Sequence, residues 1–221
     1  MKTISLTIDG NNVTAPEGEN ILWTALDNAI YIPNLCAIRG GHEPASACRL
    51  CFVEVAGKER PVTACTEPVA DGMVVNTRGE KALRLARSAF ELLMASHPVD
   101  CGHCAANRSC ELQKIARHVG VSLKTKRFRK IARDLPVDES HRLYIYDPNK
   151  CVLCGRCVRV CRERRGRAVL GFAFRGFQRA VTTFGAEPLG NSECRDCGEC
   201  VAICPVGALA FKNGAQHEKA G

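Results

Sequence analysis

Residues 151–161 read C-V-L-C-G-R-C-V-R-V-C, and residues 194–205 read C-R-D-C-G-E-C-V-A-I-C-P. Each stretch has the spacing C-x2-C-x2-C-x3-C, which is typical of segments that bind [4Fe–4S] clusters in pairs. Three thiolates on one tight loop can hold three corners of a cubane cluster, and the fourth corner then needs a ligand from elsewhere in the chain. The spacing therefore predicts two [4Fe–4S] clusters in this half of the sequence.

In this arrangement the fourth cysteine of each stretch serves the cluster of the other stretch. We expect one cluster to be bound by Cys151, Cys154, Cys157 and Cys204, and the other by Cys194, Cys197, Cys200 and Cys161. The alternative is a pair of zinc ribbons. Zinc sites of that type need only C-x2-C pairs, so they would leave the third and fourth cysteines of each stretch without a role.

A third cysteine motif lies earlier, where residues 97–110 read H-P-V-D-C-G-H-C-A-A-N-R-S-C. Its cysteines are Cys101, Cys104 and Cys110. They need a fourth ligand to complete another [4Fe–4S] site, and His97 and His103 are the two candidates. His103 is adjacent to a cysteine, so the two side chains cannot easily reach separate corners of one cluster. His97 stands three residues clear of the first cysteine, and we expect it to be the ligand.

Four cysteines near the N-terminus have the spacing C-x11-C-x2-C-x13-C. They are Cys36, Cys48, Cys51 and Cys65. One tight pair and two distant single ligands suit the small rhombic core of a [2Fe–2S] cluster held under a long loop. The alternative is a set of buried structural cysteines, and the tight pair favours the cluster.

Hydrophobic periodicity predicts the elements around these motifs. Residues 3–8 alternate apolar and polar side chains, which predicts a strand that turns at residues 9–12 into a returning strand. Residues 19–30 carry a helical stripe of apolar side chains. A hairpin followed by a helix across its sheet is the start of a β-grasp fold. We also expect helices at residues 79–96 and 111–119, a strand at 143–146 and a hairpin within 168–184.

The cysteine content argues for metal and a reducing compartment. Fifteen cysteines are an odd number and cannot all pair as disulfides. The first residues carry no signal-peptide pattern, and no apolar run is long enough to span a membrane. We therefore expect a cytoplasmic location and no direct membrane insertion. Metal-bound thiolates offset the formal charge of +8, so this charge is weak evidence for nucleic acid. We expect the basic run at residues 124–133 to be solvated or to face a subunit.

Several short motifs carry a resemblance to known proteins over about residues 1–211. They are T-A-C-T at 63–66, D-G-M-V-V-N-T at 71–77, C-E-L-Q at 110–113, C-G-R-C-V-R-V-C at 154–161 and C-P-V-G-A-L at 204–209. With these motifs the chain resembles the diaphorase small subunit of NAD-coupled bidirectional hydrogenases. It is also similar to the N-terminal iron–sulfur region of the large peripheral subunit of complex I and to the accessory-cluster region of [FeFe]-hydrogenases.

The resemblance implies an α+β chain with three cluster-binding domains. The implied domains are a β-grasp [2Fe–2S] ferredoxin domain (1–78), a His-ligated [4Fe–4S] domain with a linker (79–140) and a two-cluster ferredoxin-like domain (141–211), followed by a disordered tail (212–221). The cofactors would be one [2Fe–2S] and three [4Fe–4S] clusters.

The resemblance also implies an electron-transfer subunit without a catalytic site of its own. The sequence has no G-x-G-x-x-G dinucleotide fingerprint and no glycine-rich flavin loop, so flavin and NAD(P)H are expected on a partner subunit. The second partner would be a terminal hydrogenase or another redox enzyme, such as a formate dehydrogenase or a complex I-like assembly. A complete [FeFe]-hydrogenase is disfavoured because no cysteine remains for a catalytic metal. A nucleic-acid-binding regulator would not need four clusters, and we expect no nucleic-acid partner.

Overall fold

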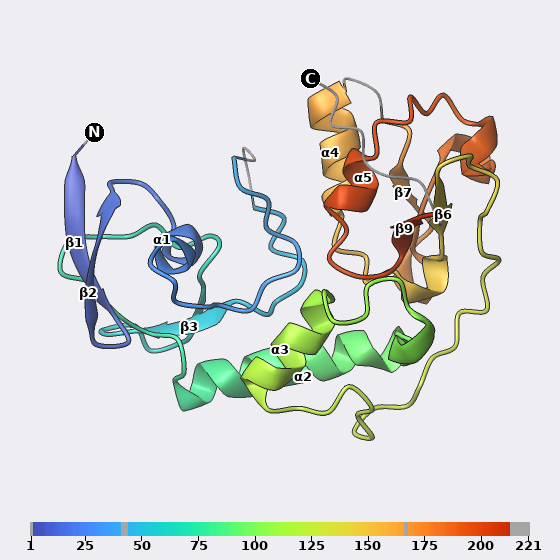
Figure 1. Ribbon diagram of the computed structural model, residues 1–221. Helices are drawn as coiled ribbons and strands as arrows, with labels where there is room; N and C mark the ends of the chain where they lie inside the picture. The colour runs from blue at the N-terminus through green and yellow to red at the C-terminus, as the bar shows by residue number, and fades with distance from the viewer. Residues whose placement is uncertain (1, 41–43, 166–167, 213–221) are drawn as a thin grey trace. The chain divides into compact units, whose positions relative to one another are not determined.

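The computed structural model describes residues 2–40, 44–165 and 168–212 (Figure 1). The expected α+β class is confirmed, because the structure combines helices with short strands that pair mostly antiparallel. The chain divides into two compact units. The first comprises residues 1–92 and 115–122, and the second comprises residues 93–114 and 123–221.

The first unit is built on a five-stranded sheet with the strand order β2-β1-β5-β3-β4. The strands are β1 (Thr3–Ile8), β2 (Asn11–Pro16), β3 (Phe52–Val55), β4 (Val62–Thr63) and β5 (Val74–Asn76). Strand β1 pairs antiparallel with β2 and parallel with β5. The predicted strand at residues 3–8 and its returning partner are confirmed. A mixed sheet of this order with one covering helix is the expected β-grasp fold.

Helix α1 (Ile21–Asp27) is shorter than the expected span of residues 19–30. Asn20 caps its first turn, because the Asn20 side chain accepts a hydrogen bond from the backbone N–H of Trp23. The helix ends before Ala29, whose φ of 59° lies in the left-handed region. The apolar stripe therefore continues past the helix into a turn, which periodicity alone does not reveal.

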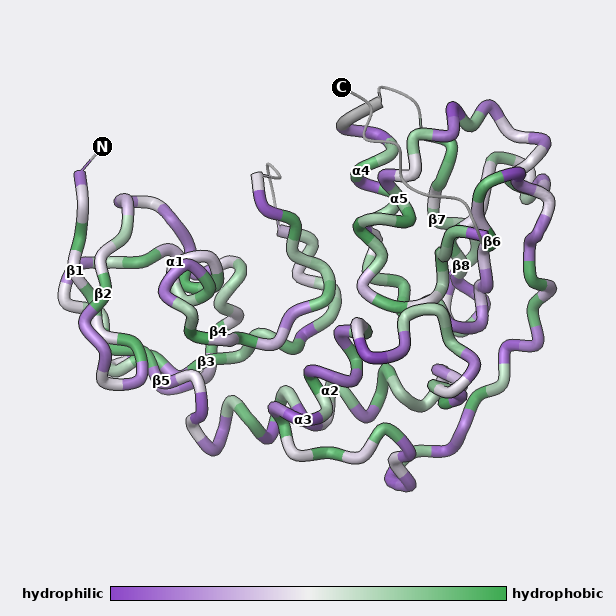
Figure 2. Tube along the Cα trace, viewed as in Figure 1, coloured by the Kyte–Doolittle hydropathy of each residue, from purple (hydrophilic) through white to green (hydrophobic). Residues whose placement is uncertain are grey.

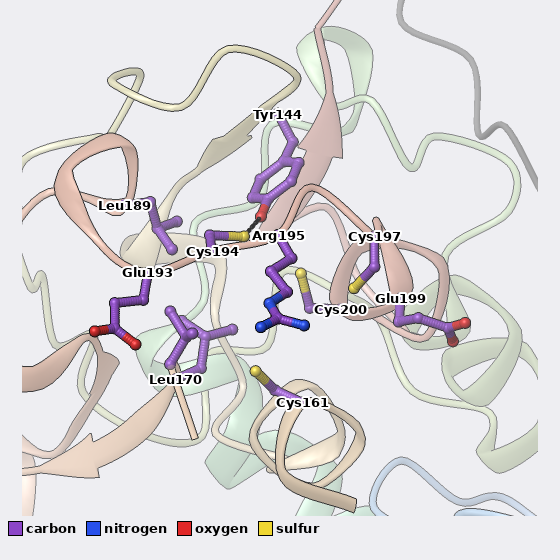
Figure 3. A pocket seen from close by; sticks show the side chains of 11 residues that line it. Tyr144, Cys161, Leu170, Leu189, Glu193, Cys194, Arg195, Cys197, Glu199 and Cys200 are labelled. Atoms are coloured by element: carbon purple, nitrogen blue, oxygen red, sulfur yellow. Dashed lines mark hydrogen bonds between the residues drawn. The ribbon is translucent and has the colours of Figure 1, made fainter. Parts of the chain in front are cut away.

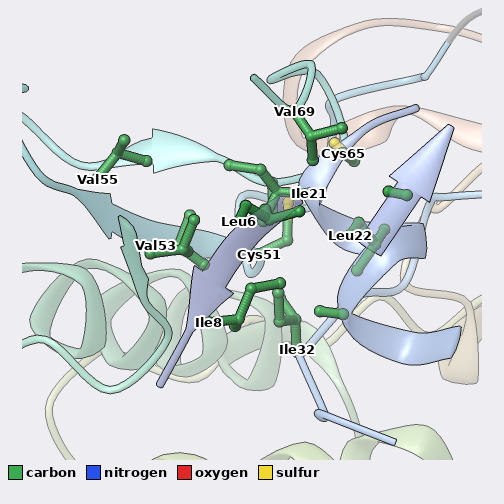
Figure 4. Packing of buried hydrophobic residues seen from close by; sticks show 14 of the residues in the cluster. Leu6, Ile8, Ile21, Leu22, Ile32, Cys51, Val53, Val55, Cys65 and Val69 are labelled. Carbon is green, nitrogen blue, oxygen red and sulfur yellow. The ribbon is translucent and has the colours of Figure 1, made fainter. Parts of the chain in front are cut away.

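The core of this unit lies between α1 and the sheet. Ile21 and Leu22 of α1 are fully buried and face Leu6, Ile8 and Val53 of the sheet (Figure 4). The alternation of hydrophobic and hydrophilic residues along β1 is visible in Figure 2. Burying side chains of this size stabilises the fold by about 1.5–3 kcal/mol each, so the core provides a rigid base for the loops that carry cysteines.

Helices α2 (Glu80–Ser96) and α3 (Glu111–Val119) match the two predicted helices within one residue. In the first unit, the Arg87 Nε of α2 donates a hydrogen bond of 2.7 Å to the carbonyl of Val119 at the end of α3. The first turn of α2 is held by β3, because Glu54 Oε1 accepts a 3.1 Å hydrogen bond from the backbone N–H of Ala82.

The second unit contains two two-stranded sheets and two helices. In one sheet β6 (Tyr144–Tyr146) pairs with β9 (Leu209–Phe211), and in the other β7 (Gly171–Ala173) pairs with β8 (Ala180–Thr182). The helices are α4 (Arg156–Arg165) and α5 (Glu199–Ala202). Short 3-10 turns lie at Cys101–His103, Pro148–Lys150, Gly176–Gln178, Phe184–Ala186 and Leu189–Asn191. The predicted hairpin within residues 168–184 is confirmed as the antiparallel pair β7–β8.

Most of the predicted tail, residues 212–221, lies outside the described residues. Lys212 is described, and its backbone N–H donates to the carbonyl of Leu143, which continues the pairing of β6 with β9. Every helix in the described part of the chain is too short or too polar to cross a lipid bilayer.

The link between Glu54 and α2 predicts a local stability effect. Glu54→Ala removes an acceptor from the first turn of α2 and should destabilise it by about 1 kcal/mol. Amide hydrogen exchange of this turn, measured anaerobically on the loaded protein, should become faster. Glu59→Ala makes the same change at an exposed position after β3 and serves as the matched control. Equal exchange in both variants would show that Glu54 does not cap the helix.

Candidate iron–sulfur centres

The four N-terminal cysteines form one buried group in the first unit. Cys36, Cys48, Cys51 and Cys65 are 2%, 8%, 2% and 3% exposed. The Sγ atoms of Cys36 and Cys48 lie 3.5 Å apart, and Cys51 and Cys65 are hydrogen-bonded neighbours. A group of four buried thiols that form no disulfide is a soft donor set, which suits iron in a sulfide cluster.

The sheet and a strained loop position this group. Cys51 is directly followed by β3, and its carbonyl accepts a 2.9 Å hydrogen bond from the backbone N–H of Ala64, beside Cys65. Ser46 and Arg49 flank Cys48 with φ values of 47° and 54°, in the left-handed region that non-glycine residues rarely adopt. Strain of this kind is maintained where the surroundings over-determine a functional loop.

Contacts between the thiols shift their pKa values in both directions. The hydrogen bond with Cys36, followed by burial, raises the pKa of Cys48 far above its usual range, and contact with Cys65 does the same for Cys51. The hydrogen bond from Cys51 lowers the pKa of Cys65 to about 7. Cys48 and Cys51 therefore stay protonated at neutral pH until a metal displaces their protons.

His97, Cys101, Cys104 and Cys110 line one open cavity of about 320 Å³ in the second unit. The Nδ1 atom of His97 is buried and has no hydrogen-bond partner. Burial lowers the pKa of His97, and a contact with the backbone of Lys150 acts in the opposite direction. A histidine that binds a metal through one nitrogen usually gives its other N–H to a carbonyl or carboxylate. The donor set and the buried, unpaired nitrogen fit a cluster.

His103, the other candidate, has a different environment. Its side chain is 88% exposed, and its Nδ1 lies 2.9 Å from a carboxylate oxygen of Asp100. It does not line the cavity that contains His97. Within this cavity the structure brings His97, and not His103, together with the three cysteines.

One wall of this cavity is a glycine from the last cysteine motif. A Cβ atom added to Gly207 would lie 2.4 Å from Cys104 Sγ, which is closer than real Cβ contacts. The backbone N–H of Glu111, next to Cys110, donates to the carbonyl of Pro205, so the same segment is also held by hydrogen bonding. The C-P-V-G sequence is therefore part of two sites, which spacing rules do not predict.

A second cavity, of about 500 Å³ and open to solvent, gathers the C-terminal cysteines of one predicted set. Its lining includes Cys161 together with Cys194, Cys197 and Cys200. In Figure 3 the four sulfur atoms point toward a common space, with Cys161 projecting from α4. The structure thus places Cys161 beside the cysteines of the later motif.

Cys204, the last cysteine of the later motif, lies near the earlier motif. A charge on Cys204 would raise the pKa of Cys151, Cys154 and Cys157, the three cysteines of that motif. Burial, the largest cause, raises the pKa of Cys154 to about 12. The charge of Cys200 also acts on Cys157, so the two groups are neighbours.

The two cluster loops repeat the same backbone geometry. In the first loop Leu153 and Gly155 have φ values of 55° and 76°, and in the second Asp196 and Gly198 have φ values of 57° and 67°. The left-handed residues occupy equivalent places on either side of the second cysteine. This curvature turns successive side chains inward and exposes backbone N–H groups, one of which, from Leu153, lies 3.4 Å from the first sulfur of its loop.

Sequence reasoning missed three aromatic side chains around these cysteines. Tyr144 and Tyr146 of β6 are buried at alternate positions, and the Tyr144 hydroxyl lies 2.6 Å from Cys194 Sγ. His141 is 3% exposed and stacks on Tyr144 with a centroid distance of 3.6 Å. The only signal in the sequence was the period-two repeat of tyrosine, which also fits an ordinary strand.

Two side chains of the basic run at residues 124–133 donate hydrogen bonds to the protein's own backbone. Lys130 Nζ donates to the carbonyl of Met94, and Arg133 donates to the carbonyls of Pro148 and Arg179. These cations satisfy backbone carbonyl acceptors within the second unit. This part of the run therefore has a structural role.

Profiles of three domain families match successive parts of the chain. The 2Fe-2S iron-sulfur cluster binding domain matches residues 1–80, and the iron-sulfur binding region of NADH-ubiquinone oxidoreductase-G matches residues 87–123. The ferredoxin-like domain of NADH-quinone oxidoreductase subunit 3 matches residues 144–210. Domains that bind 2Fe-2S and 4Fe-4S clusters are therefore present.

Curated relatives are considerably longer than this chain. NADPH-Fe(3+) oxidoreductase subunit alpha of Geobacter sulfurreducens is 39% identical over 95% of this chain, which spans 24% of that relative. NADP-reducing hydrogenase subunit HndD of Solidesulfovibrio fructosivorans is 35% identical over 95% of this chain, which spans 36% of its length. The chain thus spans only about a quarter to a third of these two relatives.

One solved structure is similar over nearly its whole length. A chain from the crystal structure of an NAD+-reducing [NiFe]-hydrogenase in the H2-reduced state superimposes with a TM-score of 0.84 and 31% sequence identity. The similarity covers 96% of this chain and 88% of that chain. Together with the domain matches and the grouped cysteines, it leads to one conclusion. This chain belongs to the family of iron–sulfur subunits that NAD-coupled hydrogenases share with NADH-quinone oxidoreductase.

Proposed function

We propose that this chain relays single electrons between a partner subunit that oxidises NAD(P)H on a flavin and a terminal redox enzyme such as a hydrogenase. Bound iron–sulfur clusters exchange one electron at a time, whereas NAD(P)H delivers two as a hydride, so a flavin must divide them. The protein's own contribution is to hold the clusters close together and to exclude water from their ligands.

The observation that supports a relay is the continuity of three cysteine groups in the second unit. Gly207 contacts Cys104 of the histidine-containing group and stands three residues after Cys204. Cys204 acts on the earlier C-terminal group, where Cys157 is a neighbour of Cys200 in the later group. A regulator that senses one signal would not need adjoining sites arranged in this way.

We further assign the ligands of four clusters. The [2Fe–2S] cluster would be bound by Cys36, Cys48, Cys51 and Cys65, and the first [4Fe–4S] cluster by His97, Cys101, Cys104 and Cys110. The remaining two would be bound by Cys151, Cys154, Cys157 and Cys204 and by Cys194, Cys197, Cys200 and Cys161. The shared cavities and the unpaired Nδ1 of His97 support these sets.

We also infer a cytoplasmic location and an assembly of several subunits. Fifteen cysteines without a disulfide among them suit a reducing compartment. The relatives include an NADP-reducing hydrogenase and an NADPH-Fe(3+) oxidoreductase, which supports a flavin- and NAD(P)H-binding subunit as one partner. An electron-transfer role in a formate dehydrogenase or a complex I-like assembly would use the same clusters.

The relay predicts a specific dependence on a flavoprotein. The isolated chain, loaded anaerobically with about 14 irons and as many sulfides, should not oxidise NADH or NADPH with an artificial acceptor. Addition of the flavoprotein that co-purifies with it should allow NAD(P)H to reduce its clusters, as followed by EPR. Zinc without sulfide would contradict the clusters, and NAD(P)H oxidation by the isolated chain with its own bound flavin would contradict the relay.

The histidine assignment predicts a difference between two nearby residues. His97→Ala should lose one iron or the whole cluster of about four irons, and His97→Cys should keep the cluster but lower its reduction potential. The potential falls because a thiolate is one charge more negative than a neutral imidazole. His103→Ala is the matched control and should retain both the iron and the potential. The reverse pattern in redox-titrated EPR would assign the ligand to His103.

The crossed ligand sets predict an effect at a distance in sequence. Cys161→Ser should damage the cluster of Cys194, Cys197 and Cys200, although Cys157 is its nearest cysteine in the sequence. EPR of the reduced protein should show loss of this signal, with the signal of the Cys151 group retained. Loss of the other signal alone would mean that each motif binds its cluster locally.

A further inference from the structure

Two tyrosines of β6 reach the two C-terminal cysteine groups from the same face of the strand. The hydroxyl of Tyr144 lies 2.6 Å from Cys194 Sγ (Figure 3). The hydroxyl of Tyr146 donates a 2.8 Å hydrogen bond to the carbonyl of Val181 and also contacts Cys151. The two residues are therefore chemically alike, but their hydroxyl protons have different acceptors.

The direction of the Tyr144 bond follows from the state of the sulfur. A free thiol could donate to the phenol oxygen, but a cysteine bound to iron is a thiolate and has no proton to give. In the loaded protein only the O–H of Tyr144 can therefore be the donor. Burial, followed by the contact with Cys194, raises the pKa of Tyr144 well above its usual range, so the hydroxyl keeps its proton.

Neighbouring groups hold the Tyr144 ring in place. His141 stacks on it at an interplanar angle of 21°, and Nε2 of His141 lies 2.9 Å from a carboxylate oxygen of Asp196. The backbone N–H of Leu143 donates to Nδ1 of His141, so both nitrogens of the imidazole are engaged. A ring clamped in this way cannot easily turn its hydroxyl away from the sulfur.

We propose that Tyr144 is a positioning residue that sets the reduction potential of the cluster bound by Cys194, Cys197, Cys200 and Cys161. An O–H group that donates to a ligand sulfur spreads the negative charge of the reduced cluster, so it favours uptake of an electron. This inference deepens the proposed relay and rests on its ligand assignment for Cys194.

The expected size follows from the strength of one hydrogen bond. A hydrogen bond to a charged acceptor is stronger than one to a neutral acceptor, and part of this bond is already present in the oxidised cluster, whose ligands are also thiolates. The remaining difference is about a tenfold change in the equilibrium constant for reduction. This corresponds to about 59 mV for a one-electron couple.

Tyr146 supplies the matched comparison. The Tyr146 hydroxyl has one proton, and it donates this proton to the Val181 carbonyl, which can only accept. Any hydrogen bond from Tyr146 to Cys151 is therefore weak. Tyr146→Phe should therefore change the potential of its own cluster by less than Tyr144→Phe changes that of the other. Each substitution removes one oxygen atom and keeps the ring that fills the buried space.

The test is a redox titration of the loaded chain followed by EPR. Tyr144→Phe should lower the reduction potential of the Cys194 cluster, so that the equilibrium constant for its reduction falls about tenfold. The reduction potential of the Cys151 cluster should not change. Electron–nuclear double resonance after exchange into D2O should show one exchangeable proton coupled to the reduced Cys194 cluster in the wild type and in Tyr146→Phe that is missing in Tyr144→Phe, whereas couplings to backbone N–H protons should be the same in all three.

The outcomes separate this inference from the relay and its ligand sets. If Tyr144→Phe keeps an intact four-iron cluster with unchanged potential and unchanged proton coupling, the role proposed for Tyr144 is wrong. The relay and its ligand sets would not be affected by that result. A Cys194→Ser variant that keeps both C-terminal clusters unaltered would instead overturn the ligand assignment on which it rests. Wild-type protein without such a coupled proton would also refute the hydrogen bond.

Discussion

The exchange of Cys161 and Cys204 between the two C-terminal motifs is the constraint on which the second unit depends. Its strands are only three residues long, and pairs of such short strands have little stability of their own. In the proposed ligand sets, two groups of metal–thiolate bonds would each join distant parts of the chain and supply the missing cross-links. The folding free energy of this unit would then be largely metal-binding free energy, as in other small metal-containing domains.

The same thiolates govern the charge of the protein. Burial raises the pKa of Cys154 and Cys200 to about 12, so these two thiols are neutral at physiological pH. At these two positions a thiolate charge would arise only as a metal displaces the proton, and metal binding becomes more favourable as pH rises toward these values. The formal excess of +8 is best understood as a counter-charge for ligands that ionise on loading.

The sequence predicted what depends on local spacing. Alternation defined β1, the helix expected at residues 111–119 matches α3 to the residue, and the cysteine intervals indicated which cysteines would gather. Contacts between residues that are far apart in the sequence were missed. Gly207 must be small because Cys104 lies beside it, and Tyr144 acts because Cys194 lies at its hydroxyl. Neither contact leaves a pattern in the chain, because the partners are separated by long and irregular segments.

The position of Gly207 has a consequence for biosynthesis. The N-terminal group has all its cysteines once Cys65 has left the ribosome, and its sheet is complete soon afterwards at β5. The histidine-containing cavity lacks a wall until Gly207 has been made, although its last cysteine, Cys110, emerges much earlier. The two sites therefore become complete at different times during synthesis, the N-terminal one soon after β5 has been made and the histidine-containing one only after Gly207.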